Sequence, residues 1–551
     1  MCDGLVYDAG QVKPIRRATV QLLDASGSTV LDTTVADDQG RYSLTANAST
    51  DVVIRVRAEL LQSGAASWNV QVRNNVVDPS AETVPQLDQR PLYVMDSPVF
   101  NSGTIDIDRP TMVATTGWGG SSYTGPRVAA PFAILDSIYQ AMLLILAEDP
   151  SADFPALDAY WSPDNGTSPR TGSFEDTFAN GDLGVSFYFR GPTGDGSVIG
   201  PSLFLLGKDG DDTEEFDSHV IVHEWGHYFE DNFSRSDSIG GSHGAGDILD
   251  KRVSFGEGWA TALSAIALDD PSYCDSLWFA GQLRGFEINA ENEPANSEEG
   301  WYNETTVIKF LYDLWDTNAD IAADTGSIGF TPIFDVLTGP QIFTEAFTSI
   351  FSFATALKTV SGEDAFIDGL LTAYGIEANV DIWGSTETND TNPDAVVDDV
   401  FPLYTDVTLG APTRICVNNQ FDTGRDGNKL AQHRFLRFEL GSSQPLTFSM
   451  TTVDPPTTPA TTNFDCDDPD FSQHSDPDFR VWGSVDEGPL SAEGFVFLVN
   501  AQSCEANLES ESPGGIFPIG TYVIDLYEGR YSDPDTANSF PERLCYDFTI
   551  N

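Results

Sequence analysis

Apolar and polar residues alternate in a strand-like pattern over the first ninety residues and again after about residue 405. The stretches ATVQLLDASG, STVLDTTVADDQGRYSLTA and DVVIRVRAEL are separated by turn residues and predict short β-strands. Gly40 stands in the turn DDQGRYSL, where a positive φ is needed, and this predicts a hairpin. Strands are predicted in the same way near the C-terminus, at RFLRFEL, LTFSMTTV, DFRVWG, GFVFLVN, TYVIDLYEG and CYDFTI.

Between about residues 110 and 400 the hydrophobic period becomes that of helices. The segment 129–150, AAPFAILDSIYQAMLLILAEDP, places its apolar residues on one helical face and ends at Pro150. Strand candidates follow at LDAYWS, VSFYFR and SLFLLG, and then several helices, which predicts an α+β domain. A chain of 551 residues is too long for one core. We therefore expect a multidomain protein with a β-sandwich over 1–90, an α+β domain over 91–404 and a second β-sandwich over 405–551.

The segment 217–233, DSHVIVHEWGHYFEDNF, carries the most specific chemical signal of the chain. His223 and His227 are one helical turn apart, so both imidazoles leave the same face of a helix and can bind one ion. Glu224 lies beside that face, where it can accept a proton from water without being a ligand. An H-E-x-x-H pattern on a helix predicts a zinc site, whereas a buried helix with two ordinary histidines is the alternative.

Two histidines need a third protein ligand. A metzincin would continue with Gly and His, but Glu230 and Phe233 occupy those positions and exclude that family. The segment 253–268, VSFGEGWATALSAIAL, has helical periodicity and carries Glu257 near its start. Its GEGW wording is similar to the third-ligand motif of the fungalysin-like metallopeptidases. Asp247, in GAGD, is the alternative third ligand.

The longer run HEWGHYFEDNFSRSDSIGGSHGAGDILDKRVSFGEGWATALSAI also resembles a group of secreted bacterial zinc peptidases. Together these motifs imply a zincin-like metallopeptidase domain of the gluzincin type. The resemblance implies a catalytic Zn2+ held by His223, His227 and Glu257, with Glu224 as the general base. In the fungalysin and thermolysin patterns, an Asp four residues after the ligand Glu orients a zinc-binding histidine. Thr261 stands at that position here.

We therefore expect the orienting partner to come from elsewhere, with Asp250, Asp231 or a backbone carbonyl as candidates. A further group should stabilise the oxyanion that develops during peptide hydrolysis. His243, in the Gly-rich stretch GGSHGAG, and Tyr302, at the start of WYNETTVIKFLYDLWD, are the first candidates, followed by Arg252. An ordinary loop histidine and a packed tyrosine are the alternative interpretations of the first two.

Both flanking regions also resemble known modules. In the first, the strand ATVQLL and the later stretch DDQGRYSL resemble the transthyretin-like or carboxypeptidase-regulatory-like β-sandwich, in which an x-A-T-V-x-L strand is followed by a T-D-x-x-G-x-Y-x-L hairpin. In the last, RFLRFEL, LTFSMTT and TYVIDLYEG resemble β-sandwich domains appended to many secreted bacterial peptidases. The resemblances imply accessory roles for both modules rather than chemistry.

The charge balance limits the partners of the protein. Acidic residues outnumber basic ones by 85 to 27, which gives a formal net charge of -58. Such a chain repels nucleic acid and anionic lipid, because both bind by neutralisation of their own negative charge. No apolar run of about 18 residues or more is present, so we expect no transmembrane segment. No signal peptide is recognisable at the start.

Six cysteines are present: Cys2, Cys274, Cys416, Cys466, Cys504 and Cys545. The last four lie in the strand-rich C-terminal region and predict disulfides in an oxidising compartment, although the sequence does not choose among their three pairings. Cys2 is a candidate for a bacterial lipid anchor, with an ordinary residue as the alternative.

Two Asp-rich stretches, 207–217 and 465–479, are candidates for structural Ca2+, although neither has EF-hand spacing. The strand at 202–207 is expected to form a sheet edge that pairs with an extended peptide. We therefore expect a secreted or cell-surface, monomeric zinc metallopeptidase that acts on protein or peptide substrates. The alternatives are a cell-surface binding lipoprotein whose zincin domain does not turn over, and a hydrolase of non-peptide amides or esters.

Overall fold

The computed structural model forms two compact units. It describes residues 12–78, 84–109, 111–120, 122–169, 174–191, 199–279, 282–292, 299–389, 400–421, 426–453, 475–485, 496–501, 508–513, 515–532 and 543–551. Unit 1 comprises Met1–Asn232 and Ala260–Ala290, and unit 2 comprises Phe233–Trp259 and Glu291–Asn551. Helix α4, Lys251–Leu268, contributes its first half to unit 2 and its second half to unit 1.

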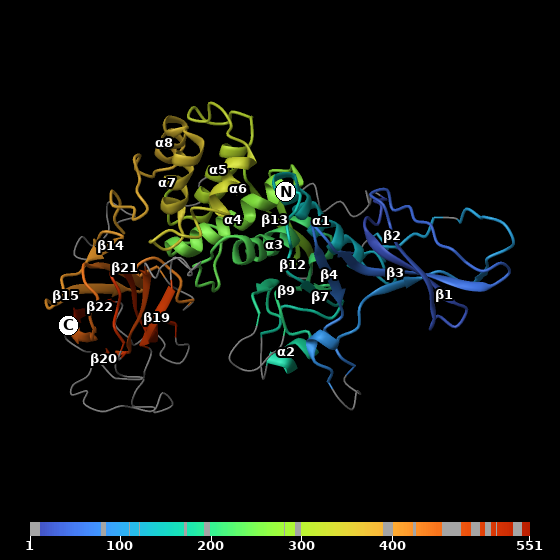
Figure 1. Ribbon diagram of the computed structural model, residues 1–551, viewed down its shortest axis with the longest axis horizontal. Helices are drawn as coiled ribbons and strands as arrows, with labels where there is room; N and C mark the ends of the chain where they lie inside the picture. Colours follow the sequence, from blue (N-terminus) through green and yellow to red (C-terminus); the bar gives the residue numbers. More distant parts are fainter. Residues whose placement is uncertain are drawn as a thin grey trace. The chain divides into compact units, whose positions relative to one another are not determined.

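A nine-stranded sheet forms the framework of unit 1 (Figure 1). Its main path runs β2 (Val30–Val35), β1 (Ala18–Asp24), β3 (Asp51–Gln62), β4 (Trp68–Arg73), β7 (Leu157–Trp161), β9 (Ser202–Leu205) and β8 (Phe187–Phe189). Strands β5 (Val94–Asp96) and β6 (Phe100–Asn101) pair with β3. The first four strands pair antiparallel, whereas β4 pairs with β7, and β7 with β9, in parallel.

This sheet differs from the sequence prediction in three places. The first ninety residues share it with later strands, because the second edge of β4 is hydrogen-bonded to β7, so no sheet boundary lies at residue 90. Gly40 does adopt a φ of 71° in a turn, but residues 41–47 form no strand and β2 pairs with β1 instead. Strand β9 lies between β7 and β8, so the expectation that residues 202–207 form the open edge is wrong.

Helix α1, Ala130–Glu148, packs against β3 and β4 through its apolar face. It is long and apolar enough to cross a membrane by length and composition, and 61% of its most apolar window is buried in the protein. The core helix of a water-soluble domain has the same composition. It is the one helix of this kind in the described part of the chain.

The remaining elements of unit 1 include the helix of the H-E-x-x-H segment. They are η3 (Leu87–Gln89), α2 (Phe174–Asn180), η4 (Glu214–Phe216), α3 (Ser218–Phe233) and a four-stranded sheet of β10 (Gly207–Lys208), β11 (Asp212–Thr213), β12 (Ser272–Phe279) and β13 (Gln282–Asn289). Helix α3 is apolar on most of its surface, since Ile221, Val222, Trp225 and Phe229 are fully buried. Such burial is expected of a helix in a domain interior.

Unit 2 combines helices with a β-sandwich. The helices after α4 are α5 (Glu304–Trp315), α6 (Phe330–Leu337), α7 (Ile350–Ser361) and α8 (Asp364–Ala373). Helix α5 begins where the Asn303 side chain accepts a hydrogen bond from the Thr306 amide, as an N-cap does. The sandwich, drawn in orange and red in Figure 1, has one sheet of five strands and one of four.

The five-stranded sheet runs β14 (Tyr404–Asp406), β16 (His433–Leu440), β21 (Gly520–Glu528), β18 (Pro477–Val485), β19 (Val496–Ala501). The four-stranded sheet runs β15 (Thr413–Asn418), β22 (Arg543–Ile550), β17 (Phe448–Val453), β20 (Leu508–Glu511), and the short η8 (Gly529–Ser532) follows β21. Apolar residues of both sheets form a single core, which includes Val417, Leu436 and Phe548. A disulfide between Cys416 and Cys545 joins β15 to β22 within the second sheet.

The predicted fold class is confirmed at the level of a mixed α/β multidomain protein with several β-sheets and a set of helices. Cys416–Cys545 is one of the pairings that the sequence left open, and Cys274 is disulfide-bonded as well. Cys2, Cys466 and Cys504 lie outside the described residues, as does most of the Asp-rich stretch 465–479.

Candidate metal centre

Helices α3 and α4 approach each other closely at Gly226, the glycine of HEWGH. A Cβ built on Gly226 would lie 2.9 Å from the Cα and 3.1 Å from the Cβ of Ala260. Any larger residue would therefore push the two backbones apart, because neither contact is with a flexible side chain. The small pair brings α4 within reach of the imidazoles on α3.

A second glycine packs α4 against α5. A Cβ on Gly258 would lie 2.6 Å from the Cβ of Val307 and 3.1 Å from the carbonyl oxygen of Glu304. Within unit 2, Gly258 thus allows the first half of α4 to lie close to α5. Glu257 directly precedes Gly258 and is 6% exposed.

The two histidines of the motif are arranged as a pair on one face of α3. Nε2 of His227 lies 3.2 Å from Nε2 of His223. Two imidazole nitrogens that bind one tetrahedral zinc at about 2.0–2.1 Å lie about 3.3 Å apart. The observed separation therefore matches a pair of ligands to one ion without any movement of the helix.

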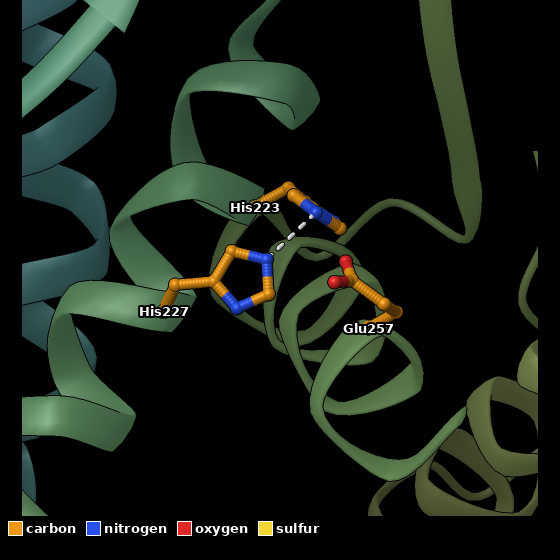
Figure 2. A group of neighbouring side chains, drawn as sticks. All are labelled: His223, His227 and Glu257. Carbon is orange, nitrogen blue, oxygen red and sulfur yellow. Dashed lines mark hydrogen bonds between the residues drawn. The ribbon is translucent and has the colours of Figure 1, made fainter. Parts of the chain in front are cut away.

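Glu257 completes a group of three. One ligand atom from each of His223, His227 and Glu257 lies within 4.8 Å of the other two. Figure 2 shows the two imidazoles projecting from one helix and the Glu257 carboxylate turned toward them from the neighbouring helix. Glu257 lies one turn before Thr261 on the continuous helix α4. Two imidazole nitrogens and one carboxylate oxygen form a donor set that suits zinc and leaves a fourth position open.

The position of His223 is fixed by Thr261. Its Nδ1 lies 2.9 Å from the Thr261 hydroxyl, and Thr261 is 2% exposed. With an ion on Nε2, Nδ1 would carry the proton and donate it to the hydroxyl oxygen. The expectation that the orienting partner comes from elsewhere is wrong. Asp231 accepts a hydrogen bond from the Tyr188 hydroxyl, and Asp250 accepts one from Arg252.

His219, one turn before His223 on α3, has partners of its own. Its Nδ1 lies 3.2 Å from the Ser264 hydroxyl, and its Nε2 is 3.9 Å from Asp270. Glu224, the residue that the motif assigns as a base, is 8% exposed. Its position directly after His223 places it beside the ligand face of α3.

The two predicted oxyanion donors are placed differently. Nε2 of His243 lies 3.5 Å from a carboxylate oxygen of Glu257 and 3.7 Å from one of Glu304, so this histidine borders the centre. Tyr302 is buried, and its hydroxyl donates to the carbonyl oxygen of Glu299. It therefore serves the local turn, in line with the packed-tyrosine alternative.

The remaining candidates have other partners. Asp247, the alternative third ligand, accepts a hydrogen bond from the Gly244 amide and lies 3.4 Å from Nζ of Lys429. Arg252 is fully buried and donates to Asp250 and to Asp525 on β21. Arg252 is thus an anchor for the start of α4 rather than an oxyanion donor.

This anchor is a buried charged network within unit 2. Arg252 lies 2.9 Å from Asp525, and Asp525 accepts a second bond at 2.6 Å from Nδ1 of His433. Although burial opposes ionisation, the charges of Arg252 and His433 hold the pKa of Asp525 below its usual range, and Arg252 lowers the pKa of Asp250 likewise. The network holds the N-terminal end of the helix that carries Glu257.

No family model and no curated protein matches the sequence. Nine chains of solved structure match part of it. One is the pre-peptidase C-terminal domain of a collagenase from Bacillus anthracis, a peptidase-associated domain, with 9% identity and a TM-score of 0.15, covering 27% of this chain and 94% of that chain. Another is PliG from Aeromonas hydrophila, a periplasmic inhibitor of g-type lysozyme, with 10% identity and a TM-score of 0.14, covering 27% and 96%. Likenesses at these TM-scores say nothing about the chemistry of the metal centre.

Proposed function

We propose that this protein is a zinc metallopeptidase of the gluzincin type. One observation carries the proposal, namely that ligand atoms of His223, His227 and Glu257 lie within 4.8 Å of one another. The helical spacing of the histidines, the 3.2 Å between their Nε2 atoms and the buried carboxylate support zinc in particular. Ca2+ and Mg2+ prefer oxygen ligands, so a site with two imidazoles would bind them weakly.

Each side chain has a separate role in the proposed reaction. Zinc would supply Lewis acidity that polarises the scissile carbonyl and lowers the pKa of water. Glu224 accepts the proton of the attacking water and passes it to the leaving amine. Thr261 keeps Nδ1 of His223 protonated, so that Nε2 presents its lone pair to the centre. His243, beside Glu257, is the candidate for stabilising developing negative charge.

Strand β8 supports a peptide as the substrate class. Strand β8 is the last strand in the order of the nine-stranded sheet among the described residues, so β8 rather than β9 offers an edge. Tyr188 of β8 donates to Asp231 and contacts Tyr228, both just after His227 on α3. An extended chain that paired with β8 would therefore run next to the helix of the motif. The Cys416–Cys545 disulfide supports a secreted or cell-surface location, since disulfides persist in oxidising compartments.

The test is hydrolysis of a mixed set of quenched fluorescent peptides by the wild-type protein and by Glu224→Gln, each with its zinc content measured by mass spectrometry. We expect a loss of at least about 10²–10⁴-fold in rate with zinc retained, because the substitution removes the base and keeps all three ligands. Glu230→Gln is the matched control, since Glu230 lies on the same helix and is 1% exposed. It should keep both zinc and activity.

Two outcomes contradict the proposal. If the zinc-loaded wild type cleaves no peptide and no denatured protein, a cell-surface binding protein without turnover becomes the better interpretation. If it hydrolyses amides or esters but not peptides, the substrate class is wrong while the roles of Glu224 and the zinc ligands stand.

A further inference from the structure

A second group of carboxylates lies in unit 1, just before helix α3. Asp212 is on the short strand β11, Glu214 begins η4, and Asp275 is on β12. One oxygen from each of the three lies within 4.8 Å of the other two. The pairing of β11 with β12, through Asp212 and Leu277, brings Asp275 to residues that are distant in sequence.

Glu214 is the most deeply buried member of this group. Its side chain is 3% exposed, and its Oε2 atom is buried without a hydrogen-bond partner among the described residues. Oδ1 of Asp212 and Oδ1 of Asp275 are buried without a partner in the same way. Each of the three neighbouring carboxylates thus has one buried oxygen with no hydrogen-bond partner in the described part of the chain, which is costly in a protein interior.

The neighbouring acids show how this segment satisfies a buried carboxylate by protein groups alone. Glu215, which is completely buried, accepts hydrogen bonds from Arg127 and from the indole of Trp161. Asp217 accepts two bonds, from the amide and the hydroxyl of Ser276. By contrast, Oδ1 of Asp212, Oε2 of Glu214 and Oδ1 of Asp275 have no donor among the described residues, although they lie within a few residues of these pairs.

The electrostatics agree with this contrast. Burial and the charge of Asp275 raise the pKa of Asp212 to about 8, and burial raises the pKa of Asp275 to about 6. Burial and its acidic neighbours raise the pKa of Glu214 well above its usual value. The group is therefore unfavourable as three free anions and needs positive charge from protons or from a cation.

We propose that Asp212, Glu214 and Asp275 bind a calcium ion. The donor set contains oxygen only and carries three negative charges, which suits Ca2+ and excludes a zinc site built from nitrogen and sulfur. Calcium accepts six to eight oxygens, so backbone carbonyls and water would fill the positions that the carboxylates leave. The Asp-rich stretch 207–217 supplies two of the ligands, whereas Asp275 is contributed by a separate strand.

The bound ion would fix the start of the H-E-x-x-H helix. Glu214 and Asp217 flank the turn that leads into α3, where the Glu214 carbonyl accepts from the Asp217 amide and the Asp217 carbonyl accepts from the Ile221 amide. An ion shared by β11, η4 and β12 would tie this turn to the sheet. The proposal concerns stability and does not depend on the chemistry at His223 and His227.

The proposal is tested by titration of the full chain with Ca2+, in which binding is measured by calorimetry and stability by thermal unfolding. The protein is first stripped with EDTA and reloaded with one equivalent of zinc. We expect saturable binding of Ca2+ to the wild type and a rise in unfolding temperature of roughly 5 °C at a hundredfold excess over Kd. Glu214→Gln should abolish the high-affinity heat and the shift, and Asp275→Asn should do the same.

The change in unfolding temperature that Glu214→Gln causes in the absence of calcium distinguishes a calcium ligand from an ordinary buried residue. Because Glu214→Gln removes an ionisable group from a place where its ionisation is unfavourable, the calcium-free variant should unfold at the same temperature as the calcium-free wild type or higher. Asp209→Asn, on the exposed turn of the same hairpin, is the matched control and should keep the full response to calcium.

Three results would overturn the proposal. They are a wild type that shows neither heat nor shift with Ca2+, a Glu214→Gln variant with an undiminished response, and a response to Mg2+ equal to that to Ca2+. The last would contradict the assignment to calcium, because the smaller ion demands near-octahedral geometry.

Discussion

Replacement of Thr261 by valine isolates the contact that orients His223. Valine has nearly the same shape, so packing between α3 and α4 is kept while the hydroxyl is lost. The Nδ1 proton of His223 then lacks its acceptor at 2.9 Å in a region where Thr261 is only 2% exposed. Loss of such a partner weakens metal binding by about 10–100-fold. This corresponds to about 1.4–2.7 kcal/mol.

The assay is competition for zinc against a chromophoric chelator, with unfolding in urea as a check on the fold. Thr261→Ser should bind zinc within about threefold of the wild type, because the hydroxyl is retained. Ser264→Ala is the matched control, since it removes the equivalent hydroxyl from His219, one turn along α4. The reasoning is refuted if Thr261→Val binds zinc as tightly as the wild type, or if Ser264→Ala weakens binding equally.

Two further substitutions test the packing around the centre. Gly226→Ala forces a Cβ to within 2.9 Å of the Ala260 backbone. The variant should lose about 1–3 kcal/mol of unfolding free energy in urea and bind zinc more weakly. Gly369→Ala is the control: a Cβ at Gly369 meets no atom within 4 Å, so this variant should be as stable as the wild type or more stable. Equal losses of stability in Gly226→Ala and Gly369→Ala would contradict the close approach of α3 and α4 at Gly226. Asp525→Asn removes a buried partner of Arg252 and should cost about 3–5 kcal/mol at pH 7. Because the folded pKa of Asp525 is depressed, this stabilisation is present above the ordinary carboxylate pKa of about 4 and is lost below it. Wild type and variant should therefore converge in acid, and a gap independent of pH would refute the assignment.

Local patterns in the sequence predict the elements of the centre because helices follow from short-range periodicity. The apolar residues around HEWGH and GEGW predict both helices, and the spacing of His223 and His227 places them on one face. The role of Thr261 could not be predicted in this way. A threonine reaches an imidazole only where two helices are very close, and the closeness is set by Gly226 and Ala260 together.

Pairings between distant strands account for the other differences. No local sequence pattern indicates that β8 pairs with β9 or that β4 pairs with β7. Which strands become neighbours depends on the packing of the whole sheet. The carboxylate group shows the same limit. The Asp-rich stretch 207–217 attracts attention by composition, but Asp275 joins it only through the pairing of β11 with β12.

The ion pair between Arg252 and Asp525 can form only late in the synthesis of the protein. The two residues are separated by 273 positions in the chain. At a synthesis rate of about 5–20 residues per second, Asp525 leaves the ribosome roughly 14–55 s after Arg252. During that interval both histidines are already made, but the helix that carries Glu257 lacks its anchor. An unfinished chain therefore lacks the ion pair that holds the start of α4, and a mutation that truncates the C-terminal strands would remove this ion pair permanently.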